Sequence, residues 1–180
     1  NTATAAALED VRQMLPDIPV IGIRPALRQA EAAGCRRILS LATAGTLTSP
    51  SYARQCLALQ PETEVVSIAA PGIVRFVESG MTRREETVRD LKELFRPIEG
   101  EAFEAVVLGC THFPFAKNEI RTALGREVRF FDAADDVAKE LAGVLNAADR
   151  KEKNNVRGSV TFLNSTDSDE AIGLSWALFS

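Results

Sequence analysis

The sequence has few of the residues that most often mark a disulfide framework, a metal site or a membrane span. Its 180 residues include three cysteines and one histidine. Cys35, Cys56 and Cys110 are too scattered for a disulfide framework or for the short ligand spacings of a zinc site. No apolar run approaches the roughly 20 residues needed to cross a bilayer. We therefore expect no metal, no membrane partner and, with the thiols free, a reducing compartment such as the cytoplasm.

The charge balance argues against nucleic acid or anionic lipid as the main partner. The chain has 21 Lys+Arg and 25 Asp+Glu residues, which give a net charge of -4. Charges of both signs are mixed along the chain, so no broad cationic surface is expected. Hydrophobic residues make up 46% of the sequence, and a folded chain of this size buries roughly 70% of its unfolded surface. These values predict a soluble, globular protein.

Helical and extended patterns alternate along the chain. Apolar runs typical of strands occupy residues 19–23, 37–42, 64–69, 105–109, 127–131 and 160–163. Helical spacing or helix-start signals mark residues 8–15, 25–34, 50–59, 73–79, 83–95, the segment after Pro114, and 137–145. The helix at 50–59 is expected to begin with Ser49 as its cap and Pro50 in its first turn. This alternation predicts an α/β fold with a parallel sheet flanked by helices on both faces. Residues 149–157 form the one linker or flexible loop that the sequence suggests.

Small or polar residues follow four of the expected strands. They are residues 43–46, residues 69–72, the segment 110–112, and Asp132. Ligands of open parallel sheets bind beyond the carboxyl ends of the strands, so these segments together could line one pocket. Hydroxyls and backbone N–H groups near helix N-termini favour an anionic ligand, either a carboxylate or a phosphate.

The segment Gly109-Cys-Thr-His-Phe-Pro114 is the most informative. A cysteine between a buried strand and a helix has its thiolate stabilised by the positive helix end and by a nearby imidazole. Cys110 can therefore be a base or a nucleophile. The alternative interpretation is that Cys110 is a small core residue and that His112, the only histidine, packs locally.

Other cofactor chemistry has no sequence support. The five lysines lie in charged helix or loop contexts, which does not favour a Schiff base with pyridoxal. No GxGxxG or GxxxxGK[ST] motif follows a strand, so dinucleotide and P-loop sites are not predicted. Cys35 and Cys56 are expected to be structural. The sequence therefore predicts no cofactor.

Four segments resemble the glutamate racemases of the cofactor-independent aspartate/glutamate racemase superfamily. They are Asn1-Thr2-Ala3, residues 19–26, residues 41–46, and Val107-Leu-Gly-Cys-Thr-His-Phe-Pro114, the last being the most specific. The resemblance covers residues 1 to about 147. It implies two pseudo-symmetric α/β domains. Residues 24–132 would form one complete domain carrying the family's second catalytic cysteine, and residues 1–23 and 133–180 a remnant of the other.

The resemblance also implies a reaction and a set of site residues. Two cysteines on opposite faces of Cα would interconvert L- and D-glutamate by proton transfer, without metal or pyridoxal, and supply D-glutamate for peptidoglycan. Cys110 would be the second cysteine, His112 would tune or relay its proton, and Glu78 would be the carboxylate near the site. The residues implied to bind the substrate are Asn1, Thr2, Thr43, Thr46, Thr111 and His112.

By this resemblance the family's first cysteine falls immediately before Asn1. The chain would then be an N-terminally truncated racemase, impaired by itself. Its exposed sheet edge and apolar faces would make it marginally stable or lead it to associate, for example as a homodimer. Three alternatives stay open. They are a non-catalytic ligand-binding or interaction module, a sister racemase or isomerase for aspartate, hydantoin or maleate, and a cysteine hydrolase with a Cys110–His112 dyad.

Overall fold

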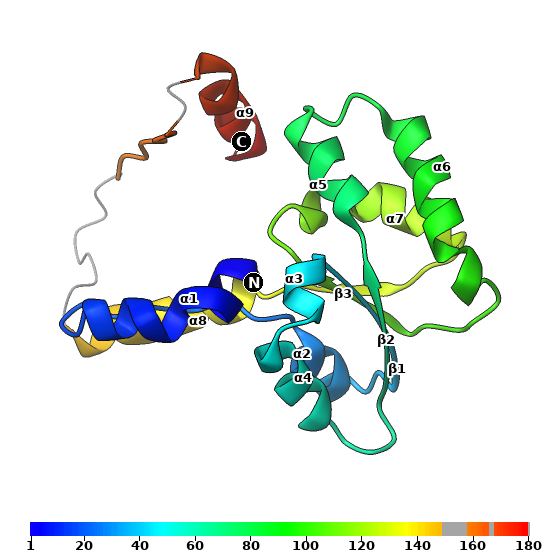
Figure 1. Cartoon of the computed structure of the whole chain (residues 1–180), viewed down its shortest axis with the longest axis horizontal. Helices are drawn as coiled ribbons and strands as arrows, with labels where there is room; N and C mark the ends of the chain where they lie inside the picture. Colours follow the sequence, from blue (N-terminus) through cyan, green and yellow to red (C-terminus); the bar gives the residue numbers. More distant parts are fainter. Residues whose placement is uncertain (149–157, 166–167, 180) are drawn as a thin grey trace.

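The computed structural model describes residues 1–148, 158–165 and 168–179, and its centre is a parallel β-sheet (Figure 1). The sheet has four strands in the order β2-β1-β3-β4, and every neighbouring pair is parallel. The strands are β1 (Arg37–Ala42), β2 (Glu64–Ala69), β3 (Ala105–Gly109) and β4 (Arg129–Phe131). This arrangement confirms the predicted α/β fold class. The predicted linker at 149–157 lies outside the described residues.

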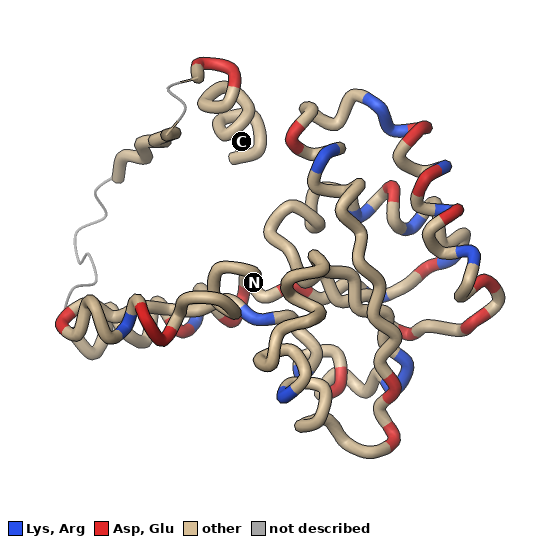
Figure 2. Tube along the Cα trace, viewed as in Figure 1, with Lys and Arg blue, Asp and Glu red and all other residues tan. Residues whose placement is uncertain are grey.

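Helices connect the strands and cover the sheet. In chain order they are α1 (Thr2–Met14), α2 (Leu27–Ala32), α3 (Ala44–Leu47), α4 (Pro50–Leu57), α5 (Pro71–Glu78), α6 (Arg84–Phe95), the 3₁₀ helices η1 (Arg96–Ile98) and η2 (Phe113–Ala116), α7 (Lys117–Leu124), α8 (Ala134–Ala147) and α9 (Asp169–Phe179). Within the described ranges, none of them has the length and apolar character that a membrane crossing requires. Basic and acidic residues alternate along α6 (Figure 2).

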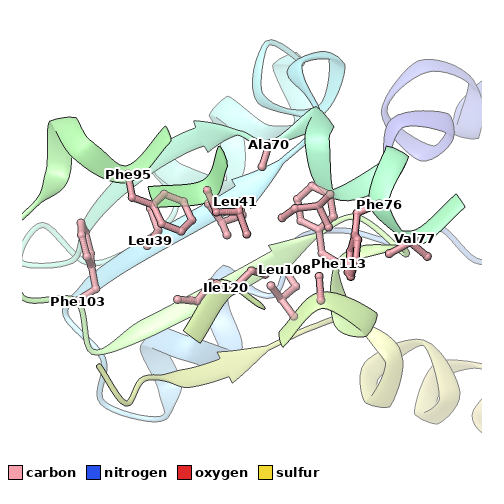
Figure 3. Packing of buried hydrophobic residues seen from close by; sticks show 14 of the residues in the cluster. Leu39, Leu41, Ala70, Phe76, Val77, Phe95, Phe103, Leu108, Phe113 and Ile120 are labelled. Carbon is pink, nitrogen blue, oxygen red and sulfur yellow. The ribbon is translucent and has the colours of Figure 1, made fainter. Parts of the chain in front are cut away.

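Two apolar clusters hold the helices against opposite faces of the sheet. Alternate residues of a strand point to opposite faces, so Leu39 and Leu41 belong to one cluster and Ile38 to the other. The first cluster joins the sheet to α5, α6, η2 and α7, and Phe113 lies fully buried within it (Figure 3). The second joins the sheet to α2 and α4. The result is three layers, helix on sheet on helix.

The two central strands are buried along most of their length, and the edge strands are not. All five residues of β3 and five of the six of β1 are buried, as expected for strands covered on both faces. β2 is an edge strand whose residues are exposed or half-buried. β4 is shorter than the predicted 127–131 because its pairing with β3 begins at Arg129, opposite Ala105.

Two predicted strands are wrong. Residues 19–23 and 160–163 are outside any sheet in the described structure. In the first run, backbone groups form hydrogen bonds with side chains of α1 in place of a neighbouring strand. Ile23 donates its N–H to Thr4 Oγ1 (2.9 Å), and the Val20 carbonyl accepts from Arg12. The second run has no neighbouring strand, and Leu163 is exposed. An apolar run becomes a strand only where another strand lies beside it.

The strands and helices α2 to α7 lie between residues 27 and 131, and three helices lie outside that range. α1 and α8 extend away from the sheet (Figure 1). Leu8 is the one buried residue of α1, and the described residues of α8 include none. These helices therefore have apolar side chains without full cover, among them Met14 and Leu141.

Candidate active site

The site lies where the order of the strands reverses. The chain passes from β1 to β2 on one side and later adds β3 on the other side of β1. Ala42 and Gly109, the last residues of β1 and β3, are paired neighbours. Thr43 and Cys110 therefore leave adjacent strands at the same edge of the sheet. This switch point is the usual ligand position in open α/β sheets.

Cys110, His112 and Glu78 form a connected series of side chains. Cys110 is half-exposed, and its Sγ lies 3.7 Å from His112 Nδ1. His112 Nε2 lies 2.5 Å from Glu78 Oε1. A carboxylate oxygen accepts hydrogen bonds, so this contact fits the tautomer in which Nε2–H donates a hydrogen bond to Glu78. The lone pair of Nδ1 in the neutral ring then faces the sulfur and can accept its proton.

Local structure holds these three side chains in place. Glu78 is the last residue of α5. His112 lies in the turn into η2, in which Phe113 donates its N–H to the Cys110 carbonyl (3.2 Å) and Phe115 donates to the His112 carbonyl (3.2 Å). Phe113 anchors this turn in the first apolar cluster. The structure therefore brings together the three residues that the sequence suggested for catalysis.

Three threonine hydroxyls form a second group, the threonine cluster of Thr2, Thr43 and Thr46. The Oγ1 atoms of Thr2 and Thr43 are 2.8 Å apart, those of Thr43 and Thr46 3.0 Å, and those of Thr2 and Thr46 3.3 Å. Thr43 also caps α3 by accepting the N–H of Thr46. Each hydroxyl can donate or accept. The cluster therefore offers neutral, adaptable hydrogen-bonding groups at the end of β1.

Asn1 directly precedes Thr2 of the threonine cluster, and its amino group interacts electrostatically with Cys110. Burial lowers the pKa of its amino group, and the charge of the Cys110 thiolate acts in the opposite direction. Asn1 Oδ1 is buried and has no hydrogen-bond partner among the described residues. A buried acceptor without a partner is unusual in proteins and suits a donor from a ligand or a water. Thr111 is exposed next to Cys110.

The other two strand ends do not share this site. Ala70, Pro71 and Gly72 line a separate cavity of about 440 Å³ together with residues of α6. Asp132 accepts from Lys117 Nζ (3.1 Å) and from the N–H of Ala134 (3.1 Å), so its carboxylate joins α7 to the start of α8. The expectation that all four strand ends line one pocket is wrong, because helix packing and this ion pair occupy two of them.

The remaining cysteines are structural, as predicted. Cys35 is fully buried, and Cys56 packs against the second apolar cluster. All three cysteines are free thiols. In residues 1–148, 158–165 and 168–179, no group of three or more His, Cys, Asp or Glu side chains could hold a metal ion.

Sequence reasoning gave Ser49 only half of its role. Its Oγ accepts the N–H of Tyr52 (3.1 Å) and so caps α4, as predicted. The same hydroxyl donates to the Thr46 carbonyl (2.8 Å) and is buried. Ser49 therefore fixes the loop that carries the threonine cluster. A serine before proline predicts a cap, but no local pattern predicts this second bond.

The fold and the site define a class of protein. It is a three-layer α/β domain with a thiol–imidazole pair at the switch point of its sheet. The family model described as Asp/Glu/Hydantoin racemase matches residues 1–141, and the chain belongs to this family. The glutamate racemase of Clostridium acetobutylicum is 33% identical to it over 179 residues, which cover 99% of this chain and 70% of that protein. The glutamate racemase of Clostridium novyi is 35% identical over 173 residues, covering 96% and 67%.

Solved structures give the same result. The glutamate racemase of Bacillus anthracis superimposes with a TM-score of 0.68 at 32% identity, over 85% of this chain and 58% of that one. The glutamate racemase of Francisella tularensis, solved in complex with D-glutamate, has a TM-score of 0.70 at 25% identity, over 86% and 57%. The chain therefore spans less than two thirds of the length of these structures.

Proposed function

We propose that this chain provides one of the two acid/base groups of a glutamate racemase. The thiolate of Cys110 would remove the Cα proton of one glutamate enantiomer, leaving the electron pair on Cα and the adjoining carboxylate. A second group on the opposite face would return a proton to Cα and so invert its configuration. The thiol proton gained by Cys110 would leave through His112.

The observation that carries this proposal is the series Cys110, His112, Glu78. An imidazole that donates to a carboxylate through Nε2 can accept a proton at Nδ1, and the positive charge that follows is stabilised by Glu78. Cys110 is only partly buried at the switch point, and a small ligand would reach its sulfur there. Membership of the Asp/Glu/hydantoin racemase family supports proton transfer rather than hydrolysis.

Neutral hydrogen-bonding groups would hold the substrate. The hydroxyls of Thr2, Thr43 and Thr46 would donate to a carboxylate, and the free Oδ1 of Asn1 would accept from the ammonium group. Thr111 lies next to Cys110 and would contribute a further hydroxyl. The glutamate racemase solved with D-glutamate supports an acidic amino acid as the ligand class. We assign the same class of ligand to this site.

The second proton carrier in this proposal is a thiol placed directly before Asn1. The hydrogen bonds of Thr2 to Thr43 and Thr46 support that position, because Asn1 precedes Thr2 and a residue next to Asn1 would lie close to the same ligand. Residues 24–132 would be one domain, and residues 1–23 and 133–180 part of a second that closes over the substrate. The whole enzyme would supply D-glutamate for peptidoglycan in the cytoplasm.

Exchange of the Cα proton for deuterium tests the proposal. Incubation of the folded chain with L- and D-glutamate in D₂O, followed by ¹H NMR, should show exchange of one enantiomer. Cys110→Ser should abolish it, since a positioned acid/base group contributes about 10²–10⁴-fold. Cys56→Ser is the matched control and should retain it. Adding a cysteine-containing segment before Asn1 should extend exchange to both enantiomers.

The result separates the competing functions. Binding of glutamate without exchange, in the extended chain as well, would favour a ligand-binding module. Exchange of aspartate but not of glutamate would favour a sister racemase. Neither binding nor exchange by a folded, extended chain would refute the proposal.

A further inference from the structure

Two charged side chains flank the connection between α5 and α6, and each has the sign that its own helix end disfavours. Glu78 is the last residue of α5, and Arg84 is the first residue of α6. A helix carries partial negative charge at its C-terminus and partial positive charge at its N-terminus. The acidic Glu78 at the C-terminal end of α5 and the basic Arg84 at the N-terminal end of α6 are therefore each unfavourable locally. Each of them contacts a side chain from elsewhere in the fold.

The two partners come from one continuous segment. His112 Nε2 meets Glu78 Oε1 at 2.5 Å, and Glu119 Oε1 accepts from an amino group of Arg84 at 2.5 Å. His112 leads into η2, and Glu119 lies in the first turn of α7, which follows η2 directly. The connection from 78 to 84 is thus fastened at both ends to the segment 112–119.

Glu119 is buried much more deeply than an ion pair between two surface helices requires. It is 3% exposed, whereas the side chain of Arg84 is 58% exposed. Its second oxygen, Oε2, is buried and has no hydrogen-bond partner within the described structure. A buried carboxylate is costly, and an apolar pair of similar size often stabilises a fold as well. The pair is therefore better explained by what it holds in place than by stability.

Backbone hydrogen bonds hold the first part of the turn between the two ends. Met81 donates its N–H to the Phe76 carbonyl and Gly80 donates to the Val77 carbonyl, both at 3.0 Å. Gly80 and Met81 have φ values of 73° and 59°. This is the Schellman arrangement that ends a helix, and the Met81 side chain packs against the first apolar cluster. Only Thr82 and Arg83 separate this held part from Arg84, so a displacement of Arg84 can be transmitted to Glu78.

We propose that Arg84 and Glu119 are a positioning pair that holds Glu78 against His112. When the pair is broken, α6 is released from α7, the turn follows α6, and the Glu78 carboxylate moves away from Nε2. Arg84 and Glu119 do not touch the ligand in this scheme. The inference rests on the proposed function only for its effect on proton transfer, because the contact between His112 and Glu78 can be measured by itself.

The single histidine makes that measurement direct. The ring ¹⁵N chemical shifts of His112 report which nitrogen carries the proton and whether Nε2–H is hydrogen-bonded, and the chain has no other imidazole signal. The Glu78→Ala variant supplies the reference ¹⁵N shifts of His112 without its contact to Glu78. Glu119→Gln and Arg84→Met should move the His112 shifts most of the way towards those of Glu78→Ala. Arg84→Lys, which keeps the charge, should leave them near the wild-type values.

Arg83→Gln is the matched control. It removes the same charge one residue away, where the arginine is exposed and its contact with Glu86 is 3.7 Å long. Its His112 shifts should be those of the wild type. If either single variant fails to fold, the double variant R84M/E119M is used in its place, because it puts an apolar pair at the two positions. It should also lose the contact between Glu78 and His112.

Wild-type His112 shifts in a folded Glu119→Gln or R84M/E119M protein would overturn the inference. Deuterium exchange provides a second readout, with an expected loss of about tenfold in Glu119→Gln for a displacement well under 1 Å. If a folded, extended chain neither binds glutamate nor exchanges its proton while the His112 shifts respond as stated, the proposed function fails and the positioning pair stands. If exchange occurs and the shifts do not respond, the reverse holds.

Discussion

Gly109→Ala should both destabilise the protein and impair the site. A Cβ atom at this position would lie 2.9 Å from Ala42 Cβ and 3.1 Å from the Leu41 carbonyl oxygen. Favourable carbon contacts lie at about 3.5–4.0 Å. Neither obstacle can rotate away, so β3 must separate from β1. Overpacking of this kind costs about 1–3 kcal/mol.

The same separation would displace Cys110 from the threonine cluster, because Cys110 directly follows Gly109. A shift of several tenths of an ångström should reduce the rate of deuterium exchange about tenfold. Thermal unfolding measures the destabilisation, at about 2–4 °C per kcal/mol for a chain of this size. The control is Gly143→Ala in α8, where a Cβ meets nothing within 4 Å. This control should gain about 0.5–1 kcal/mol.

A Gly109→Ala protein with an unchanged or higher melting temperature would refute this reasoning. A second result would also refute it. In that result the protein loses no more stability than an alanine substitution costs at an unrelated surface position of a strand, and the rate of deuterium exchange does not change. The first result would mean that β1 and β3 tolerate separation, and the second that Cys110 is placed independently of the strand that precedes it.

Three further predictions follow from the core and its caps. Burial raises the pKa of Tyr52 to about 12 from an ordinary value of 10.0. The unfolded chain therefore loses this proton at a lower pH than the folded chain. The free energy of unfolding should fall by roughly 2–3 kcal/mol between about pH 10 and 12. Denaturant unfolding of the wild type against Tyr52→Phe measures this dependence, and equal slopes would contradict it. Ser49→Ala should cost about 1 kcal/mol through the lost cap, while Ser49→Thr should cost less. A weaker affinity for glutamate in calorimetry would report the lost bond to Thr46, and unchanged affinity would count against that role. Phe113→Ala should cost about 3–5 kcal/mol, because the ring is fully buried, and a loss below 1 kcal/mol in denaturant unfolding would show that the cluster collapses around the gap.

The elements predicted correctly are those whose signals are local. β1 and β3 are mostly apolar because helices cover both of their faces, and the sequence bounds 37–42 and 105–109 match the structure. Ser49 and Pro50 start α4 at the expected residue, since an N-cap followed by proline acts within one turn. These features depend on a few neighbouring residues and can be predicted from them.

Other features depend on partners distant in sequence. Residues 19–23 have the composition of a strand, but no strand lies beside them. α3 was not predicted, because its single turn is set by the cap from Thr43 and not by apolar spacing. The contact between Glu78 and His112 joins α5 to the segment after β3, and only the family resemblance suggested it. One local signal was present, namely an acid at the C-terminal end of a helix, where the dipole disfavours it.

Each hydroxyl of Thr2, Thr43 and Thr46 lies within hydrogen-bond distance of the other two, and either atom of each pair can be the donor. Small rotations about their Cα–Cβ and C–O bonds redirect the whole ring of hydrogen bonds while the backbone stays still. Mirror-image ligands present their acidic groups along different lines, and a catalyst that interconverts them gains nothing from preferring one. In the proposed function, a neutral, re-orientable anchor for the substrate would meet that demand better than a rigid arginine fork, which would favour a single hand.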